Sequence, residues 1–224
     1  MKIDILHDVF ARNREQAAAT RRRFDEHHIV AFNLMGSPGC GKTALLEALL
    51  PRLRPQVRCA VLEGDPATFL DAERIAATGT HAVQLITDGC CHLEPNFVFN
   101  ALDKLDLDAL DAVFIENVGN LVCPAAFDLG EAHKVVVLSV TEGEDKPLKY
   151  PDMFHAAELM LLNKIDLLPY VQFDVARCVE YARRVNPGIK VLQVSATSGE
   201  GMASWYQWLR TAQQLVLIGQ AVEA

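Results

Sequence analysis

One segment of eight residues carries the strongest chemical signal in this 224-residue sequence. It reads G-S-P-G-C-G-K-T and matches the phosphate-binding pattern G-x-x-x-x-G-K-S/T. Its glycines let backbone N–H groups surround phosphate oxygens, Lys42 brings a positive charge to the β- and γ-phosphates, and the Thr43 hydroxyl can bind Mg²⁺. A chance match arises in on the order of 1% of chains of this length, so a glycine-rich turn without function is a weak alternative. The predicted nucleotide-binding residues are Gly36, Ser37, Pro38, Gly39, Cys40, Gly41, Lys42 and Thr43.

A second segment, N-K-I-D, selects the base of the nucleotide. The Asp166 carboxylate can accept hydrogen bonds from N1–H and the exocyclic amine of guanine, which adenine does not offer. Asn163 can bond the other edge of the base, and the stem of Lys164 can lie along it. Ser195 and Ala196, after the next predicted strand, resemble the loop that backs guanine in GTPases. Four letters occur easily by chance, but their position after the phosphate-binding segment favours GTP and GDP over ATP.

Acidic residues stand at the ends of two predicted strands. Asp65 closes the triplet E-G-D, and Glu116 begins the segment E-N-V-G. Acids at the carboxyl ends of strands in an open α/β sheet face the ligand crevice. We expect Mg²⁺ between Thr43, Asp65 and Glu116, with Asp65 orienting the attacking water and acting with Lys42 as a catalytic residue. The alternative is that these acids only cap helices or turns.

Thiols and one imidazole form a third group of candidate ligands. Cys90, Cys91 and His92 are adjacent in the segment G-C-C-H, and Cys123 follows later in the chain. Two thiolates and an imidazole suit Ni²⁺, Zn²⁺ or copper rather than Mg²⁺. Free cysteines are also common packing residues, so the spacing alone leaves both interpretations open. Cys123 lies seven residues after Glu116, which would put a bound metal within mechanical reach of the nucleotide.

Short apolar runs alternate with helical segments along the chain, which predicts how these residues are positioned. Strands are expected over 29–34, 57–62, 82–86, 111–115, 134–140, 159–162 and 191–194, and helices over 8–26, 42–53, 68–77, 95–104, 171–185 and 200–215. The alternation indicates an α/β fold of the P-loop NTPase type, with a mostly parallel central sheet, helices on both faces and an N-terminal helix. We divide the chain into an N-terminal helical arm (1–28), a GTPase domain with an embedded metal site (29–215) and a C-terminal tail (216–224).

Composition narrows the class of protein. Half of the residues are hydrophobic and 22% are charged, which excludes wholesale disorder. The net charge of −8 argues against nucleic acid as a partner, so the run Arg21–Arg23 is expected to be a solvated face. No apolar run approaches the roughly 20 residues that span a bilayer, so no membrane partner is expected. Six scattered cysteines in a chain of this size indicate reduced thiols and a cytoplasmic protein.

Longer segments resemble the hydrogenase nickel-incorporation GTPases, the HypB family within the SIMIBI class of P-loop GTPases. They are E-G-D at 63–65, C-H-L at 91–93, E-N-V-G-N-L-V-C-P at 116–124, L-S-V-T-E-G at 138–143 and D-K-P-L-K-Y-P at 145–151. The resemblance runs from about residue 8 to 212. It implies a slow GTPase that assists nickel insertion into the large subunit of nickel–iron hydrogenase. It also implies a GTP-promoted homodimer, a small zinc-containing nickel chaperone as a partner, and a Ni²⁺ or Zn²⁺ site at Cys91, His92 and Cys123 near the dimer interface.

The sequence departs from the family pattern in several places. It lacks the N-terminal C-x-x-C-G-C segment and the His-rich stretch of some members, so we do not expect a nickel store. Ile86, Asp88 and Cys90 alter the loop before the predicted metal site, and Cys40 replaces a serine. Three alternatives stay open: a metal-binding regulator with a structural nucleotide, an accessory GTPase for urease or a cobalamin enzyme, and a metabolic kinase. The N-K-I-D segment disfavours the kinase.

Overall fold

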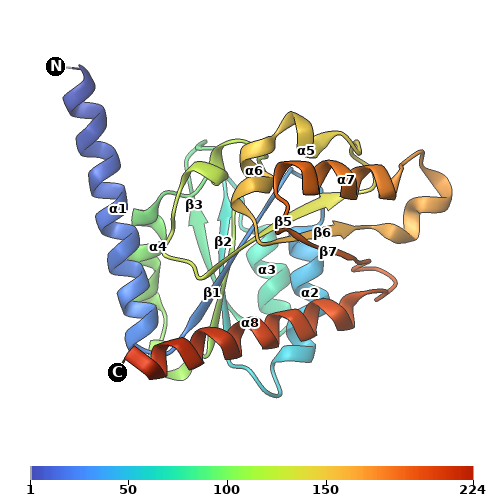
Figure 1. Ribbon diagram of the computed structural model, residues 1–224. Coiled ribbons are helices and arrows are strands. Elements are labelled where there is room, and N and C mark those ends of the chain that lie inside the picture. Colours follow the sequence, from blue (N-terminus) through green and yellow to red (C-terminus); the bar gives the residue numbers. More distant parts are fainter. Residues whose placement is uncertain (1, 224) are drawn as a thin grey trace.

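The chain alternates strands and helices from the first strand onward (Figure 1). This computed structural model describes residues 2–223, and side chains are described for residues 11–219. The strands are β1 (Val30–Gly36), β2 (Cys59–Asp65), β3 (His81–Ile86), β4 (Ala112–Glu116), β5 (His133–Ser139), β6 (Leu159–Asn163) and β7 (Lys190–Gln193). The α-helices are α1 (Lys2–Glu26), α2 (Lys42–Leu53), α3 (Leu70–Ala77), α4 (Pro95–Ala101), α5 (Lys146–Lys149), α6 (Pro151–Ala156), α7 (Val175–Val185) and α8 (Met202–Glu223). Short 3-10 turns cover Leu102–Lys104, Leu107–Ala109, Cys123–Ala126 and Ile165–Tyr170.

All seven strands form one parallel sheet in the order β3-β2-β4-β1-β5-β6-β7. The register places Glu63 of β2 beside Glu116 of β4, and Ser139 of β5 beside Asn163 of β6. Because the strands are parallel, the loops that leave their carboxyl ends gather along one edge of the sheet. The predicted α/β fold with a P-loop and an N-terminal helix is confirmed.

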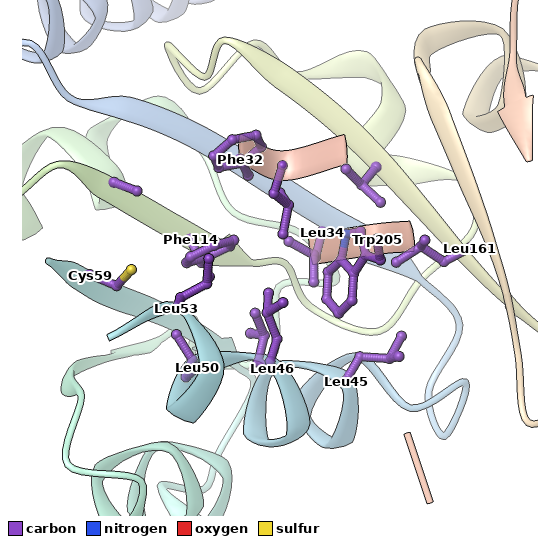
Figure 2. Close-up of a cluster of buried hydrophobic side chains, with 14 of the residues drawn as sticks. Phe32, Leu34, Leu45, Leu46, Leu50, Leu53, Cys59, Phe114, Leu161 and Trp205 are labelled. Atoms are coloured by element: carbon purple, nitrogen blue, oxygen red, sulfur yellow. The ribbon is translucent and has the colours of Figure 1, made fainter. Parts of the chain in front are cut away.

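Helices cover both faces of the sheet. On one face, leucines of α2 pack against β1, β4 and Trp205 of α8, as Figure 2 shows for Leu45, Leu46 and Leu50. The other face is covered by α1 and α4 over β2 and β4, and by α6 and α7 over β5 and β6. Each fully buried leucine stabilises the fold by about 1.5–3 kcal/mol relative to an exposed one. The central strands are therefore fixed from both sides, and the loops at their ends are presented on a rigid base.

Helix α1 lies along the side of the molecule next to α4 (Figure 1). Phe24, near the end of α1, is buried in the core between the helix and the sheet. Arg21 pairs with Asp128 at 2.8 Å, and Arg23 pairs with Asp103 at 2.9 Å. The basic run is thus not simply a solvated face, because two of its arginines attach the helix to the domain.

Several predicted boundaries were wrong in informative ways. The helix expected to end at residue 215 continues to Glu223, because Val216 and Leu217 pack against the core. The division into arm, domain and tail stays a prediction. Helix α7 begins at Val175 and not at 171, because the Asp174 side chain caps it by accepting a bond from the backbone N–H of Arg177 at 2.9 Å. The short helices α5 and α6 were missed. Residues 1 and 224, the outer limits of the expected arm and tail, lie outside the described residues.

Within residues 2–223, none of the helices combines the length and the apolar character that crossing a membrane requires.

Candidate nucleotide and metal sites

The phosphate-binding loop joins β1 to α2, in the setting that the sequence predicts. Gly41 has a φ of +99°, and a Cβ there would lie 2.4 Å from Nδ2 of Asn163, so only glycine fits. The Lys42 ammonium lies 3.5 Å from the carbonyl oxygen of Gly36. Ser37 donates a hydrogen bond to the Glu142 carboxylate, whose other oxygen accepts the backbone N–H of Ser139 at 2.7 Å. The loop is therefore held in shape by contacts from the ends of β5 and β6.

A cavity of about 430 Å³ opens beside this loop, a volume within the usual range of ligand pockets. Three segments provide most of its lining, namely the loop and first residues of α2, the end of β2 and the segment after β4. Asp71 and Arg74 of α3 complete it. The lining residues predicted from sequence are Pro38, Gly39, Gly41, Lys42, Thr43, Asp65 and Glu116.

The donor atoms at the base of the cavity fit Mg²⁺. The Thr43 hydroxyl donates to Oε1 of Glu116 at 2.8 Å, and both side chains are buried. The second Glu116 oxygen has no hydrogen-bond partner among the described residues, and neither does one oxygen of Glu63. Hydroxyl and carboxylate oxygens are the ligands that Mg²⁺ prefers. Thr43 and Glu116 would hold the ion, with Glu63 beside them.

Glu63 is a site residue that the sequence reasoning passed over. Burial first, and then the neighbouring Glu116 carboxyl, raise the pKa of Glu63 to about 11. Burial also raises the pKa of Glu116. Two buried carboxyls in contact do not both ionise at neutral pH, so the pair holds a proton. The available signal was the strand pattern, because Glu63 and Glu116 end neighbouring strands at the same register.

Asp65 lines the cavity but is engaged in a turn. Its carboxylate accepts the backbone N–H groups of Ala67 at 2.8 Å and Thr68 at 2.6 Å. Burial acts to raise the pKa of Asp65, but these backbone hydrogen bonds outweigh it and lower the pKa below the usual range. Asp65 is therefore an ionised turn acid in the cavity wall, and its role toward water or Mg²⁺ stays a prediction.

Two of the residues that are expected to recognise the base, Asn163 and Lys164, form hydrogen bonds with the phosphate-binding loop. Asn163 donates from Nδ2 to the Cys40 carbonyl at 2.9 Å, and its Oδ1 accepts the N–H of Ala196 at 3.4 Å. Ser195 donates to the Asp166 carboxylate at 2.5 Å. Lys164 donates from Nζ to the Gly39 carbonyl at 2.6 Å. The two predicted halves of the nucleotide site are thus joined directly.

Cys40 contributes its backbone carbonyl, and not its thiol, to the contacts between the phosphate-binding loop and Asn163. Its side chain is buried in the core on the α2 face. Burial raises the pKa of the Cys40 thiol to about 11, so it is protonated at neutral pH.

The three predicted soft ligands converge in space. The ligand atoms of Cys91, His92 and Cys123 all lie within 4.8 Å of one another. The two sulfur atoms are 3.0 Å apart, and Nδ1 of His92 is 3.7 Å from the Cys91 sulfur. Desolvation lowers the pKa of His92, which favours the neutral imidazole that a metal needs. Cys90 is exposed and lies outside this cluster.

The imidazole of His92 is oriented by its neighbours. Its ring stacks on Phe127, with centroids 4.1 Å apart and planes inclined by 22°. Its Nε2 lies 3.9 Å from the Glu94 carboxylate. At this distance the Glu94 carboxylate acts on the ring by its charge and not by a hydrogen bond, and Nε2 of His92 has no hydrogen-bond partner among the described residues. Glu94 and Phe127 are therefore supporting residues that the sequence reasoning did not identify.

The chain is similar to known proteins in both sequence and fold. The chain matches the CobW/HypB/UreG nucleotide-binding domain over residues 30–193. It is similar to the hydrogenase maturation factor HypB of Escherichia coli K12, with 56% identity over 209 residues, 93% of this chain and 72% of that protein. The crystal structure of HypB from Archaeoglobus fulgidus is 37% identical with a TM-score of 0.85, covering 91% of this chain and 99% of that one. The structure of HypB from Helicobacter pylori in complex with nickel is 34% identical with a TM-score of 0.88, covering 92% and 97%.

Proposed function

Because this chain belongs to the CobW/HypB/UreG family and, within it, to the HypB hydrogenase maturation factors, we propose that it is a GTP-hydrolysing metallochaperone for nickel. It converts GTP slowly to GDP and phosphate, and its nucleotide state controls the metal site of Cys91, His92 and Cys123. The nickel is destined for the large subunit of nickel–iron hydrogenase, and a small zinc-containing nickel chaperone supplies or receives it.

One observation carries this proposal: the nucleotide and metal sites share a single segment. Glu116, at the end of β4, accepts a hydrogen bond from Thr43 of the phosphate-binding loop. Seven residues later the same segment brings Cys123 to Cys91. A change at the γ-phosphate can reach a metal ligand through this short stretch. A switch requires differential binding between two states, and this connection provides a route for it.

The chain's own residues divide the work of hydrolysis. Backbone N–H groups of the loop bind the β- and γ-phosphates, and Lys42 stabilises the negative charge that grows there. The N-K-I-D segment selects and orients guanine through Asp166, and Asp65 orients the attacking water. Magnesium, when bound, supplies charge neutralisation at the phosphates, and Thr43 and Glu116 are the residues that would hold it.

The ligand set supports nickel as the cargo. Two thiolates and an imidazole favour soft or borderline ions such as Ni²⁺ and Zn²⁺ over Mg²⁺. The similar HypB of Helicobacter pylori has been crystallised in complex with nickel. Cys91 is exposed and Cys123 half-buried, so an ion held there can be passed to another protein.

Two exposed apolar side chains stand in the segments that lead to the metal ligands, and both are available for the proposed homodimer. Val122, adjacent to Cys123, is 59% exposed, and Ile86 at the end of β3 is 43% exposed. Exposed apolar groups of this kind mark protein–protein contacts when they gather on one surface. A dimer formed here in the GTP state would place the metal sites near the interface.

Calorimetric titration of Ni²⁺ and Zn²⁺ into the reduced protein tests the proposal. The titration is run with GDP and then with a non-hydrolysable GTP analogue, on the wild type, Cys91→Ala and Cys123→Ala. We expect binding that requires both cysteines and whose affinity differs between the two nucleotides. Cys90→Ala is the matched control, because its thiol is exposed next to the site but outside the cluster. Equal nickel affinity in both nucleotide states of the wild type would overturn the proposal.

A further inference from the structure

We infer that Asn120 is a positioning residue that couples Cys123 to the phosphate-binding loop. The inference rests on the proposed function and names the residue through which nucleotide state reaches the metal site. Asn120 lies in the segment between Glu116 and Cys123, and its backbone and side chain make contacts in opposite directions.

The side chain of Asn120 holds the metal-binding loop. Its Oδ1 accepts the backbone N–H of Val122 at 2.7 Å and that of Cys123 at 3.3 Å. Its Nδ2 donates toward the Cys123 sulfur at 3.7 Å. One carboxamide thus fixes both the backbone and the ligand atom of Cys123.

The backbone of Asn120 is bonded to the phosphate-binding loop. Its N–H donates to the Gly36 carbonyl at 2.9 Å, forming an isolated antiparallel bridge between these two residues. The Lys42 ammonium lies 3.5 Å from the same carbonyl oxygen. When phosphates bind, they compete for the Lys42 charge, so the environment of the Gly36 carbonyl changes with the ligand. Asn120 is the residue that shares this acceptor.

The residue before Asn120, Gly119, packs tightly against Pro38 of the phosphate-binding loop. A Cβ on Gly119 would lie 2.9 Å from three atoms of Pro38, so the two backbones are in direct contact. A shift of the phosphate-binding loop therefore displaces the residue before Asn120 as well. Packed elements transmit such shifts because they cannot absorb them by compression.

The other half of the metal site is anchored where the same segment leaves β4, at Asn117. The N–H of Leu93, next to His92, donates to Oδ1 of Asn117 at 3.1 Å. Asn117 donates to Asn33 at 3.3 Å, and Asn33 donates to Glu131 at 2.9 Å, in a buried chain within the sheet. None of these bonds involves the phosphate-binding loop. Movement of that loop would change the position of Cys123 relative to Cys91, and with it the geometry offered to the metal.

Nickel titration of Asn120 variants in two nucleotide states tests this inference. Ni²⁺ alone is the probe, and the readout is the ratio of nickel affinities with GDP and with a non-hydrolysable GTP analogue. In Asn120→Ala we expect the ratio to fall to within about twofold of one, from a wild-type ratio in the range of about 5–150 that allosteric couplings typically show. A merely structural role would lower nickel affinity equally in both states and leave the ratio unchanged.

A conservative variant and a control at a distant asparagine complete the design. Asn120→Asp keeps the acceptor for the N–H groups of Val122 and Cys123, so it should retain part of the ratio. Asn100→Ala removes an exposed carboxamide from α4, outside the segment that joins the two sites, and should keep the full ratio. A wild-type ratio of one overturns the proposed function itself. A wild-type ratio that persists in Asn120→Ala overturns only the role of Asn120.

Discussion

The nucleotide and metal sites lie at the same edge of the sheet but are built in opposite ways. In the nucleotide site Lys42, Thr43 and Asn163 are buried and already hydrogen-bonded. In the metal site Cys91 is exposed on a loop, and Cys123 is half-buried at the start of a short 3-10 turn. The first site is rigid before its ligand arrives, whereas the second leaves its ligands accessible. The difference suits the proposed function, in which the protein recognises one nucleotide closely and releases a metal.

The largest effect is expected from Asp166→Asn, which changes a predicted base-recognition residue of the nucleotide site. The Asp166 carboxylate is predicted to accept hydrogen bonds from two guanine donors, whereas the amide of the variant can accept only one and presents an N–H₂ donor. Two charge-assisted hydrogen bonds contribute about 1.5–3 kcal/mol each, so GTP affinity should fall by about 10³-fold. Xanthosine triphosphate, which offers a carbonyl in place of the exocyclic amine, should gain affinity. Fluorescent-nucleotide competition measures both, and an unchanged preference for GTP would remove Asp166 from base recognition.

A smaller effect is expected from Glu94→Gln on the metal side. The variant keeps the shape of the side chain but removes the charge that lies 3.9 Å from Nε2 of His92. Loss of such an outer carboxylate typically lowers metal affinity by about 10–100-fold, and we expect the lower end for this partly exposed pair. GTP affinity should stay within about twofold of the wild type. Titrations with nickel and with nucleotide test whether the variant lowers nickel affinity while leaving GTP affinity unchanged.

The smallest effect is expected from Glu63→Gln, in the wall of the nucleotide cavity. The pKa of Glu63 is raised to about 11 in the folded protein, so the folded side chain keeps its proton at neutral pH. In the unfolded chain the same carboxyl loses its proton above the ordinary glutamate pKa. Wild-type stability should therefore fall as pH rises from about 5 to about 9, while glutamine has no proton to lose. Without divalent cations, each pH unit in this range should lower the stability of the wild type relative to the variant by at most about 1.4 kcal/mol, or about 3–5 °C in melting temperature. Thermal denaturation across pH checks this, and parallel curves would contradict it.

Much of the fold followed from the sequence because its signals are local. The α2 boundaries, Lys42–Leu53, were predicted correctly, since the phosphate-binding segment must open a helix. The helices α5 and α6 were missed because each is shorter than two turns and has a proline in its first turn. The extension of α8 depends on contacts of Val216 and Leu217 with distant residues, which no local pattern contains.

The candidate site shows the same limit. Cys91, His92 and Cys123 could be chosen from residue type, and the structure brings them together. The supporting residues could not be chosen in this way. Asn120 and Glu94 have ordinary side chains whose importance depends on which backbone groups and rings lie next to them. Such contacts arise from tertiary packing and become visible only in three dimensions.

The contacts of Asn163 and Lys164 with the phosphate-binding loop have a consequence for affinity. Because these residues bond to Cys40 and Gly39, the base-binding and phosphate-binding halves form a single preassembled unit. In the proposed function GTP binds this unit at two points: once the triphosphate is bound, guanine faces its own subsite at a high effective concentration. Guanosine and inorganic triphosphate, offered as separate molecules, lack that advantage, and neither can reproduce the chelate formed by the intact nucleotide.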